Sequence, residues 1–122
     1  MTDLNLTINS DLAREILTGF IKSEITRVGL TRAVVGLSGG VDSALSCALA
    51  AEALGPQNVL AVRMPYKASS KDSLEHAQLL IDQLGVQSKT IEITDMVEPL
   101  FKIHPDISNM RKGNIMARER MI

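Results

Sequence analysis

The sequence predicts an α/β fold in three layers, with a parallel sheet between helices on both of its faces. Short apolar runs rich in valine, such as residues 32–37 and 58–64, alternate with longer stretches of helical periodicity. This alternation is typical of right-handed strand–helix–strand units, which build parallel sheets. Aromatic residues make up only 2% of the 122 residues and hydrophobic residues 45%, so the core is expected to be aliphatic. A chain of this length is expected to form a single domain over residues 1–122.

The first predicted element is an amphipathic helix over residues 9–29. Its apolar side chains recur at near-helical spacing, at Leu12, Ile16, Phe20 and Ile25. Asn9 or Ser10 is expected to cap this helix, and Gly29 to end it. The valine-rich run at residues 32–37 follows as a strand that is covered on both faces.

The remaining elements follow from caps, breakers and periodicity. A helix begins near Asp42 and ends at Gly55. Another is capped by Ser70 or Asp72 and ends at Gly85. The other predicted elements are strands at residues 58–64 and 88–93, a short helix at 95–103, a loop at 104–112 and a helix at 113–122. The last helical pattern still runs at Ile122, so we expect the front part of a longer domain.

Charge and cysteine content exclude several classes of protein. The 13 lysines and arginines nearly balance 14 acids, so no overall charge attracts nucleic acid or an anionic membrane. Cys47 is the single cysteine, which excludes an internal disulfide and a CxxC site. No signal peptide and no apolar run of membrane-spanning length is recognisable, so we expect a cytoplasmic protein.

The residues after the first strand carry the strongest functional signal. Leu37 ends that strand, and the sequence continues as SGGVDS before an alanine-rich helix. Glycines allow a tight turn and close approach of a ligand, and the helix start offers free N–H groups to phosphate. The hydroxyl groups of Ser38 and Ser43 can add hydrogen bonds to the phosphate oxygens. Asp42 would repel phosphate unless it held a divalent cation, and Mg²⁺ commonly bridges a carboxylate and substrate phosphates.

Other loop types fit this stretch less well. A Walker A loop requires a lysine that is absent, and the glycines do not follow the dinucleotide pattern. The string GLSGG fits a nucleophile elbow around Ser38, which would then need His76 or His104 as its base. A further alternative is a plain turn in which Ser38 or Asp42 caps the helix.

The stretch GLSGGVDSAL resembles the signature of the PP-loop ATP pyrophosphatases, which include NAD synthetases, GMP synthetases and tRNA-modifying enzymes. The resemblance implies an adenine nucleotide alpha hydrolase-like (Rossmann-like) fold, incomplete here, and a loop that binds the pyrophosphate part of ATP. The ATP-binding residues that it implies are Gly36, Leu37, Ser38, Gly39, Gly40, Val41, Asp42 and Ser43. It also implies Asp42 as the ligand of Mg²⁺.

Two further segments resemble the NAD synthetases in particular. In residues 59–85, Arg63 matches an arginine that the family associates with ATP. In residues 112–121, KGNIMARERM resembles a segment whose first arginine, here Arg118, is associated with deamido-NAD. Thr2 rather than a cysteine follows Met1, and no glutaminase segment precedes the loop, so the resemblance is to the ammonia-dependent type.

The resemblance implies a ligase that converts deamido-NAD, ATP and ammonia to NAD, AMP and pyrophosphate through an adenylated intermediate. It implies no proton transfer by the residues of this region, and it implies a homodimer. Two alternatives remain open from the sequence. One is another PP-loop ATP pyrophosphatase, similar to GMP synthetases or to tRNA-modifying enzymes. The other is a fragment that binds ATP without catalysis.

Overall fold

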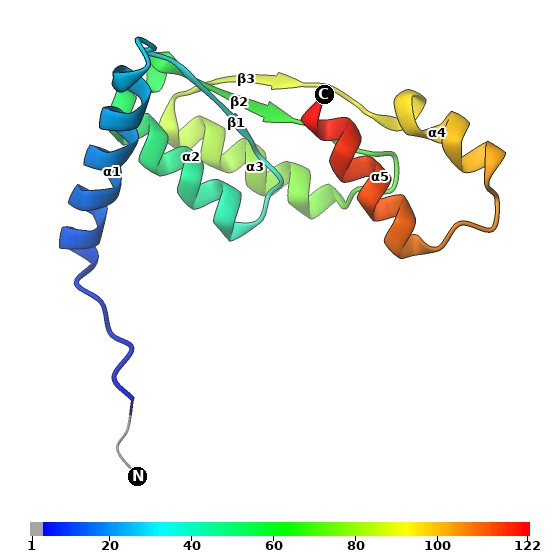
Figure 1. The fold of residues 1–122 in the computed structure, drawn as a ribbon, viewed down its shortest axis with the longest axis horizontal. Coiled ribbons are helices and arrows are strands. Elements are labelled where there is room, and N and C mark those ends of the chain that lie inside the picture. The colour runs from blue at the N-terminus through cyan, green and yellow to red at the C-terminus, as the bar shows by residue number, and fades with distance from the viewer. Residues whose placement is uncertain (1–3) are drawn as a thin grey trace.

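A computed structural model describes residues 4–122 of the chain, so Met1 and Thr2 lie outside the described residues. The elements follow one another along the chain in an order close to the predicted one (Figure 1). They are α1 (Ser10–Arg27), β1 (Ala33–Gly36), α2 (Val41–Leu54), η1 (Pro56–Asn58), β2 (Val59–Arg63), α3 (Lys71–Leu84), β3 (Gln87–Thr90), α4 (Thr94–Ile103) and α5 (Asn109–Met121).

The three strands form one parallel sheet in the order β1-β2-β3, and this confirms the predicted α/β fold with helices flanking a parallel sheet. Both connections step in the same direction along the sheet. Right-handed crossovers therefore place α2 and α3 on the same face, as Figure 1 shows. On the opposite face Val34 remains 69% exposed, so the helical layer expected there is incomplete within residues 4–122.

The main core lies between the sheet and the helices α2 and α3. It is aliphatic, as the composition predicts, and its small residues let the helices approach the strands closely. Its buried members are Leu37, Cys47, Ala50, Ala51, Val59, Ala61, Ala77, Ile81 and Val86. Cys47 is fully buried and free, in the position of a small apolar core residue.

A second, smaller core holds α4 and α5 together. Ile93, Val97 and Phe101 are its buried members, and Ile115 and Met116 of α5 pack against them. Met64 and Tyr66, which follow β2, pack against the same cluster. This core therefore attaches α5 to the segment that leaves the central strand.

The helix ends match the predicted caps except at α5. The side chains of Asn9 and Ser70 cap α1 and α3, and Gly85 adopts the left-handed conformation that ends α3. The prediction of a loop up to residue 112 was wrong, because α5 already begins at Asn109. Ser108 caps it by accepting a hydrogen bond from the N–H of Arg111.

The predicted apolar stripe of α1 forms, but it is not buried within residues 4–122. The helix packs against α2 rather than against the sheet. Leu12, Ile16 and Phe20 remain 51%, 60% and 61% exposed. None of the described helices is both long enough and apolar enough to cross a membrane.

Candidate functional site

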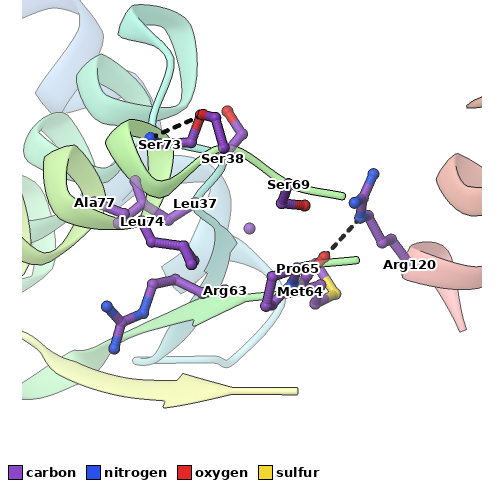
Figure 2. A pocket seen from close by; sticks show the side chains of 12 residues that line it. Leu37, Ser38, Arg63, Met64, Pro65, Ser69, Ser73, Leu74, Ala77 and Arg120 are labelled. Carbon is purple, nitrogen blue, oxygen red and sulfur yellow. Dashed lines mark hydrogen bonds between the residues drawn. The ribbon is translucent and has the colours of Figure 1, made fainter. Parts of the chain in front are cut away.

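A cavity of about 400 Å³ opens at the carboxyl edge of the sheet, where ligands bind in parallel α/β folds. Three segments far apart in the sequence surround it: the loop after β1, the segment from the end of β2 into α3, and the end of α5 (Figure 2). The residues that line it are Gly36, Leu37, Ser38, Arg63, Met64, Pro65, Ser69, Ser70, Ser73, Leu74, Ala77 and Arg120.

The loop after β1 is held in shape by its two serines. The Ser38 and Ser43 hydroxyl oxygens lie 3.0 Å apart, and the N–H of Ser38 donates to Ser43 Oγ at 3.1 Å. The N–H of Gly40 donates to Ser38 Oγ at 3.2 Å. Gly40 is the N-cap residue of α2, and no side chain caps this helix. The alternative in which Ser38 or Asp42 is a plain N-cap is therefore wrong, and the helix start remains available to an anion.

Gly39 brings the loop into contact with the first turn of α3. Its φ of +87° lies in the left-handed region that favours glycine. A Cβ atom on Gly39 would lie 2.3 Å from the carbonyl oxygen of Ser73 and 2.7 Å from its Cα. Ser73 belongs to the capped start of α3, where its N–H donates to Ser70 Oγ. The absence of a side chain at Gly39 thus lets the starts of α2 and α3 meet at one cavity.

The predicted ATP-binding residues divide into two groups. Gly36, Leu37, Ser38 and Arg63 line the cavity, although the buried side chain of Leu37 belongs to the main core. The others, Gly39, Gly40, Val41, Asp42 and Ser43, continue along the loop and into the first turn of α2, outside the lining.

Asp42 lies exposed in the first turn of α2. Within residues 4–122 no group of three or more histidine, cysteine or acidic side chains is placed to hold a metal ion. An exposed carboxylate beside an uncapped helix start is of the kind that Mg²⁺ takes, because this ion binds one or two carboxylates and completes its shell with phosphate oxygens and water.

Arg63 lines the cavity, but its guanidinium points toward α3 rather than toward the loop (Figure 2). Its NH1 group donates to Gln78 Oε1 at 2.7 Å, and Gln78 Nε2 in turn donates to Asp82 at 2.9 Å. Because the Asp82 carboxylate only accepts, the amide of Gln78 must present its oxygen to Arg63. The Nε atom of Arg63 is buried with no partner among the described residues.

The two arginines near the end of α5 have different surroundings. Arg118, the predicted deamido-NAD residue, is exposed and does not line the cavity. Arg120 is half-buried, lines the cavity, and donates from Nε to the carbonyl oxygen of Met64 at 2.8 Å. Neither Arg120 nor Ser73 was predicted from the sequence. For Arg120, a position two residues after Arg118 in a helix shows only that the two side chains face different ways.

The serine hydrolase alternative finds no support in this arrangement. Neither His76 nor His104 lines the cavity. The Ser38 hydroxyl is paired with Ser43 instead of with an imidazole. A nucleophile needs a base within hydrogen-bond reach, and the described residues place none at Ser38.

The segment after β2 is tied to α4 by a small polar cluster. Glu98 accepts a hydrogen bond from the Tyr66 hydroxyl, and Lys67 Nζ lies 3.0 Å from the Glu98 carboxylate. The hydrogen bond from Tyr66 and the nearby Lys67 ammonium lower the pKa of Glu98, and the same contact raises the pKa of Tyr66. The cluster fixes the entry to the segment that carries Ser69 and Ser70 along the cavity.

The lowered pKa of Glu98 predicts acid sensitivity. A carboxyl group with a lowered folded-state pKa stabilises the fold above its unfolded pKa, which is about 4.5 for Glu98, and this contribution is lost as the pH falls through the lower folded-state pKa. We expect Glu98→Gln to lower the melting temperature at pH 7, with the gap to the native protein closing below about pH 4. Glu75→Gln, which breaks an exposed pair with Lys71, is the control. A gap that persisted unchanged at pH 3 would contradict the prediction.

Comparison with known proteins shows the family of this chain. Residues 13–122 match the family described as NAD synthase. The chain belongs to the NAD synthase family. An NH3-dependent NAD(+) synthetase of Trichlorobacter lovleyi is 55% identical over 116 residues, which are 95% of the chain and 42% of that relative. The chain thus spans less than half the length of this curated relative.

Solved NAD synthetase structures share the fold described above. The NH3-dependent enzyme of Campylobacter jejuni superimposes with a TM-score of 0.86 at 34% identity, over 94% of the chain and 50% of that structure. The glutamine-dependent enzyme of Acinetobacter baumannii, solved with adenosine diphosphate, gives a TM-score of 0.86 at 28% identity. That match covers 98% of the chain and 24% of that structure.

Proposed function

We propose that the full-length protein is an amide-forming ligase that makes NAD from deamido-NAD, ATP and ammonia. The nicotinate carboxylate attacks the α-phosphorus of ATP and pyrophosphate leaves, which yields an adenylated intermediate. Ammonia then attacks the acyl carbon, AMP leaves, and the amide of NAD remains. The observation that carries the proposal is the uncapped start of α2 beside the glycine loop, at the edge of a cavity lined by two arginines.

The chain contributes electrostatic stabilisation rather than proton transfer. The N–H groups at the start of α2 and the hydroxyl groups of Ser38 and Ser43 can bind the oxygens of the pyrophosphate group. Asp42 would hold Mg²⁺, which supplies charge neutralisation to the phosphates when it is bound. Arg63, fixed by Gln78, adds positive charge along the wall of the cavity.

The acceptor and the assembly belong to the same proposal. Arg118, exposed on α5 and outside the cavity, is available to the deamido-NAD substrate. We further propose that residues 1–122 form part of one ATP-pyrophosphatase domain, that the protein is a homodimer, and that it acts in the cytoplasm. Neither nucleic acid nor a membrane is expected as a partner, because the charges balance at −1 overall.

The test is a turnover assay of the full-length protein with ATP, Mg²⁺ and ammonia. Deamido-NAD and xanthosine monophosphate are offered in parallel as acceptors, and AMP and pyrophosphate are quantified. We expect AMP to form with deamido-NAD only. Formation with xanthosine monophosphate alone would assign the chain to a GMP synthetase-like reaction. Replacing ammonia by glutamine, with and without a separate glutaminase, identifies the amine donor.

A further inference from the structure

Arg120 is the one charged side chain that α5 contributes to the cavity at the sheet edge. Among the described residues, the charged side chains that line this cavity are Arg63 and Arg120, and no described acid lines it. An unbalanced positive wall in a partly enclosed site favours an anionic ligand. The NH1 group of Arg63 is already engaged by Gln78.

The guanidinium of Arg120 is held in a defined orientation. Its Nε–H donates to the carbonyl oxygen of Met64, immediately after β2, at 2.8 Å (Figure 2). An arginine has five N–H donors in a planar fork, so this bond uses one and leaves the four of the two terminal nitrogens. Within residues 4–122 Arg120 forms no ion pair and no other hydrogen bond. A fork anchored at one edge in this way is suited to a phosphate group.

The anchor also depends on the second core. Ile115 and Met116 of α5 pack on that core together with Met64, so the helix and the carbonyl that accepts from Arg120 are fixed to the same cluster. Because the side chain of Arg120 is already held at the cavity, a ligand that binds it immobilises it at little further cost in conformational entropy. Arg118, two residues earlier, is exposed and lies outside the cavity.

We propose that Arg120 contacts the phosphate chain of the nucleotide bound in this cavity, across from the glycine loop. The inference rests on the proposed binding of ATP and adds a residue to it. Arg118 and Arg120 thereby divide their roles, with Arg120 toward the nucleotide and Arg118 toward the second substrate.

The experiment measures binding of ATP and of adenosine to the full-length protein in the presence of Mg²⁺, by calorimetry for ATP and ligand-observed NMR for adenosine. We expect Arg120→Met to raise the Kd for ATP by about 10- to 100-fold and the Kd for adenosine less than about twofold, since only ATP offers phosphate oxygens. Arg120→Lys should fall between, because a lysine keeps the charge without the fork. Arg111→Met, an exposed arginine in the first turn of α5, is the matched control.

Three results would overturn the inference. An equal loss of affinity for ATP and adenosine would mean that Arg120 only holds α5 against β2. Unchanged ATP affinity in Arg120→Met, or in Arg120→Lys if the first variant does not fold, would show that Arg120 does not contact the phosphates. A loss in Arg118→Met in place of Arg120→Met would exchange the two roles. A protein that binds ATP through Arg120 but forms no AMP with deamido-NAD would contradict the proposed function and support this inference.

Discussion

Replacing Gly39 by alanine is expected to abolish ATP binding and to destabilise the fold. The new Cβ would lie 2.3 Å from the Ser73 carbonyl oxygen, and the φ of +87° is strained for any residue with a side chain. The clash is with backbone, so the glycine loop must move away from α3. We expect the free energy of unfolding to fall by about 2–4 kcal/mol. Displacement of the glycine loop from its position beside ATP should reduce turnover by at least about a hundredfold.

Gly19→Ala is the matched control for this effect. Gly19 lies inside α1, and a Cβ there would meet nothing within 4 Å. Alanine is the better helix former, so the control should gain up to about 1 kcal/mol in stability. Chemical denaturation gives the free energies, and calorimetry with ATP gives the binding. A Gly39→Ala protein that bound ATP with unchanged affinity would mean that the loop is not the phosphate site.

The second large effect is expected from Asp42→Asn. Asparagine keeps the shape of the side chain and removes the charge that attracts Mg²⁺. We expect turnover to fall on the order of a thousandfold at millimolar Mg²⁺, and part of the loss to be recovered at higher Mg²⁺. The measurement is a Mg²⁺ titration of AMP formation and of ATP affinity.

Asp72→Asn serves as its control, because Asp42 and Asp72 are each the second residue of their helix, α2 and α3. Both variants lose the same favourable interaction of a carboxylate with a helix start, worth about 0.3–1 kcal/mol. Asp72 lies in the first turn of α3, whereas Asp42 follows the glycine loop directly, so the loss of Asp72 should leave the dependence on Mg²⁺ unchanged. Undiminished Mg²⁺-dependent turnover in Asp42→Asn would show that the metal is held elsewhere.

Local signals in the sequence were sufficient for most of the fold. Asn9, Ser70 and Gly85 mark helix ends by chemistry that acts within a few residues, and these ends were predicted correctly. The start of α5 was not, because Gly113 suggested a helix start while Ser108 supplied the cap four residues before the predicted loop ended. Packing of Ile115 and Met116 on the second core then stabilises a helix that tolerates an internal glycine.

The face of each element was harder to predict than its position. The periodicity of α1 indicated a buried stripe, yet Phe20 remains 61% exposed within residues 4–122. The valines of β1 suggested a strand covered on both faces, yet Val34 is 69% exposed. A pattern of apolar residues indicates that one face of an element can be buried. Which other element covers that face depends on the topology of the sheet.

The α/β order, the glycine loop and the position of Asp42 could be predicted from local residues, because turns, caps and a helix start are specified by neighbouring residues. Three further features depend on packing: Gly39 must lack a side chain to clear Ser73, Arg63 turns toward Gln78, and Arg120 rather than Arg118 lines the cavity. These three outcomes join residues 15 to 56 positions apart in the chain. Contacts over such separations are set by how helices pack on the sheet, and local sequence carries little information about that packing.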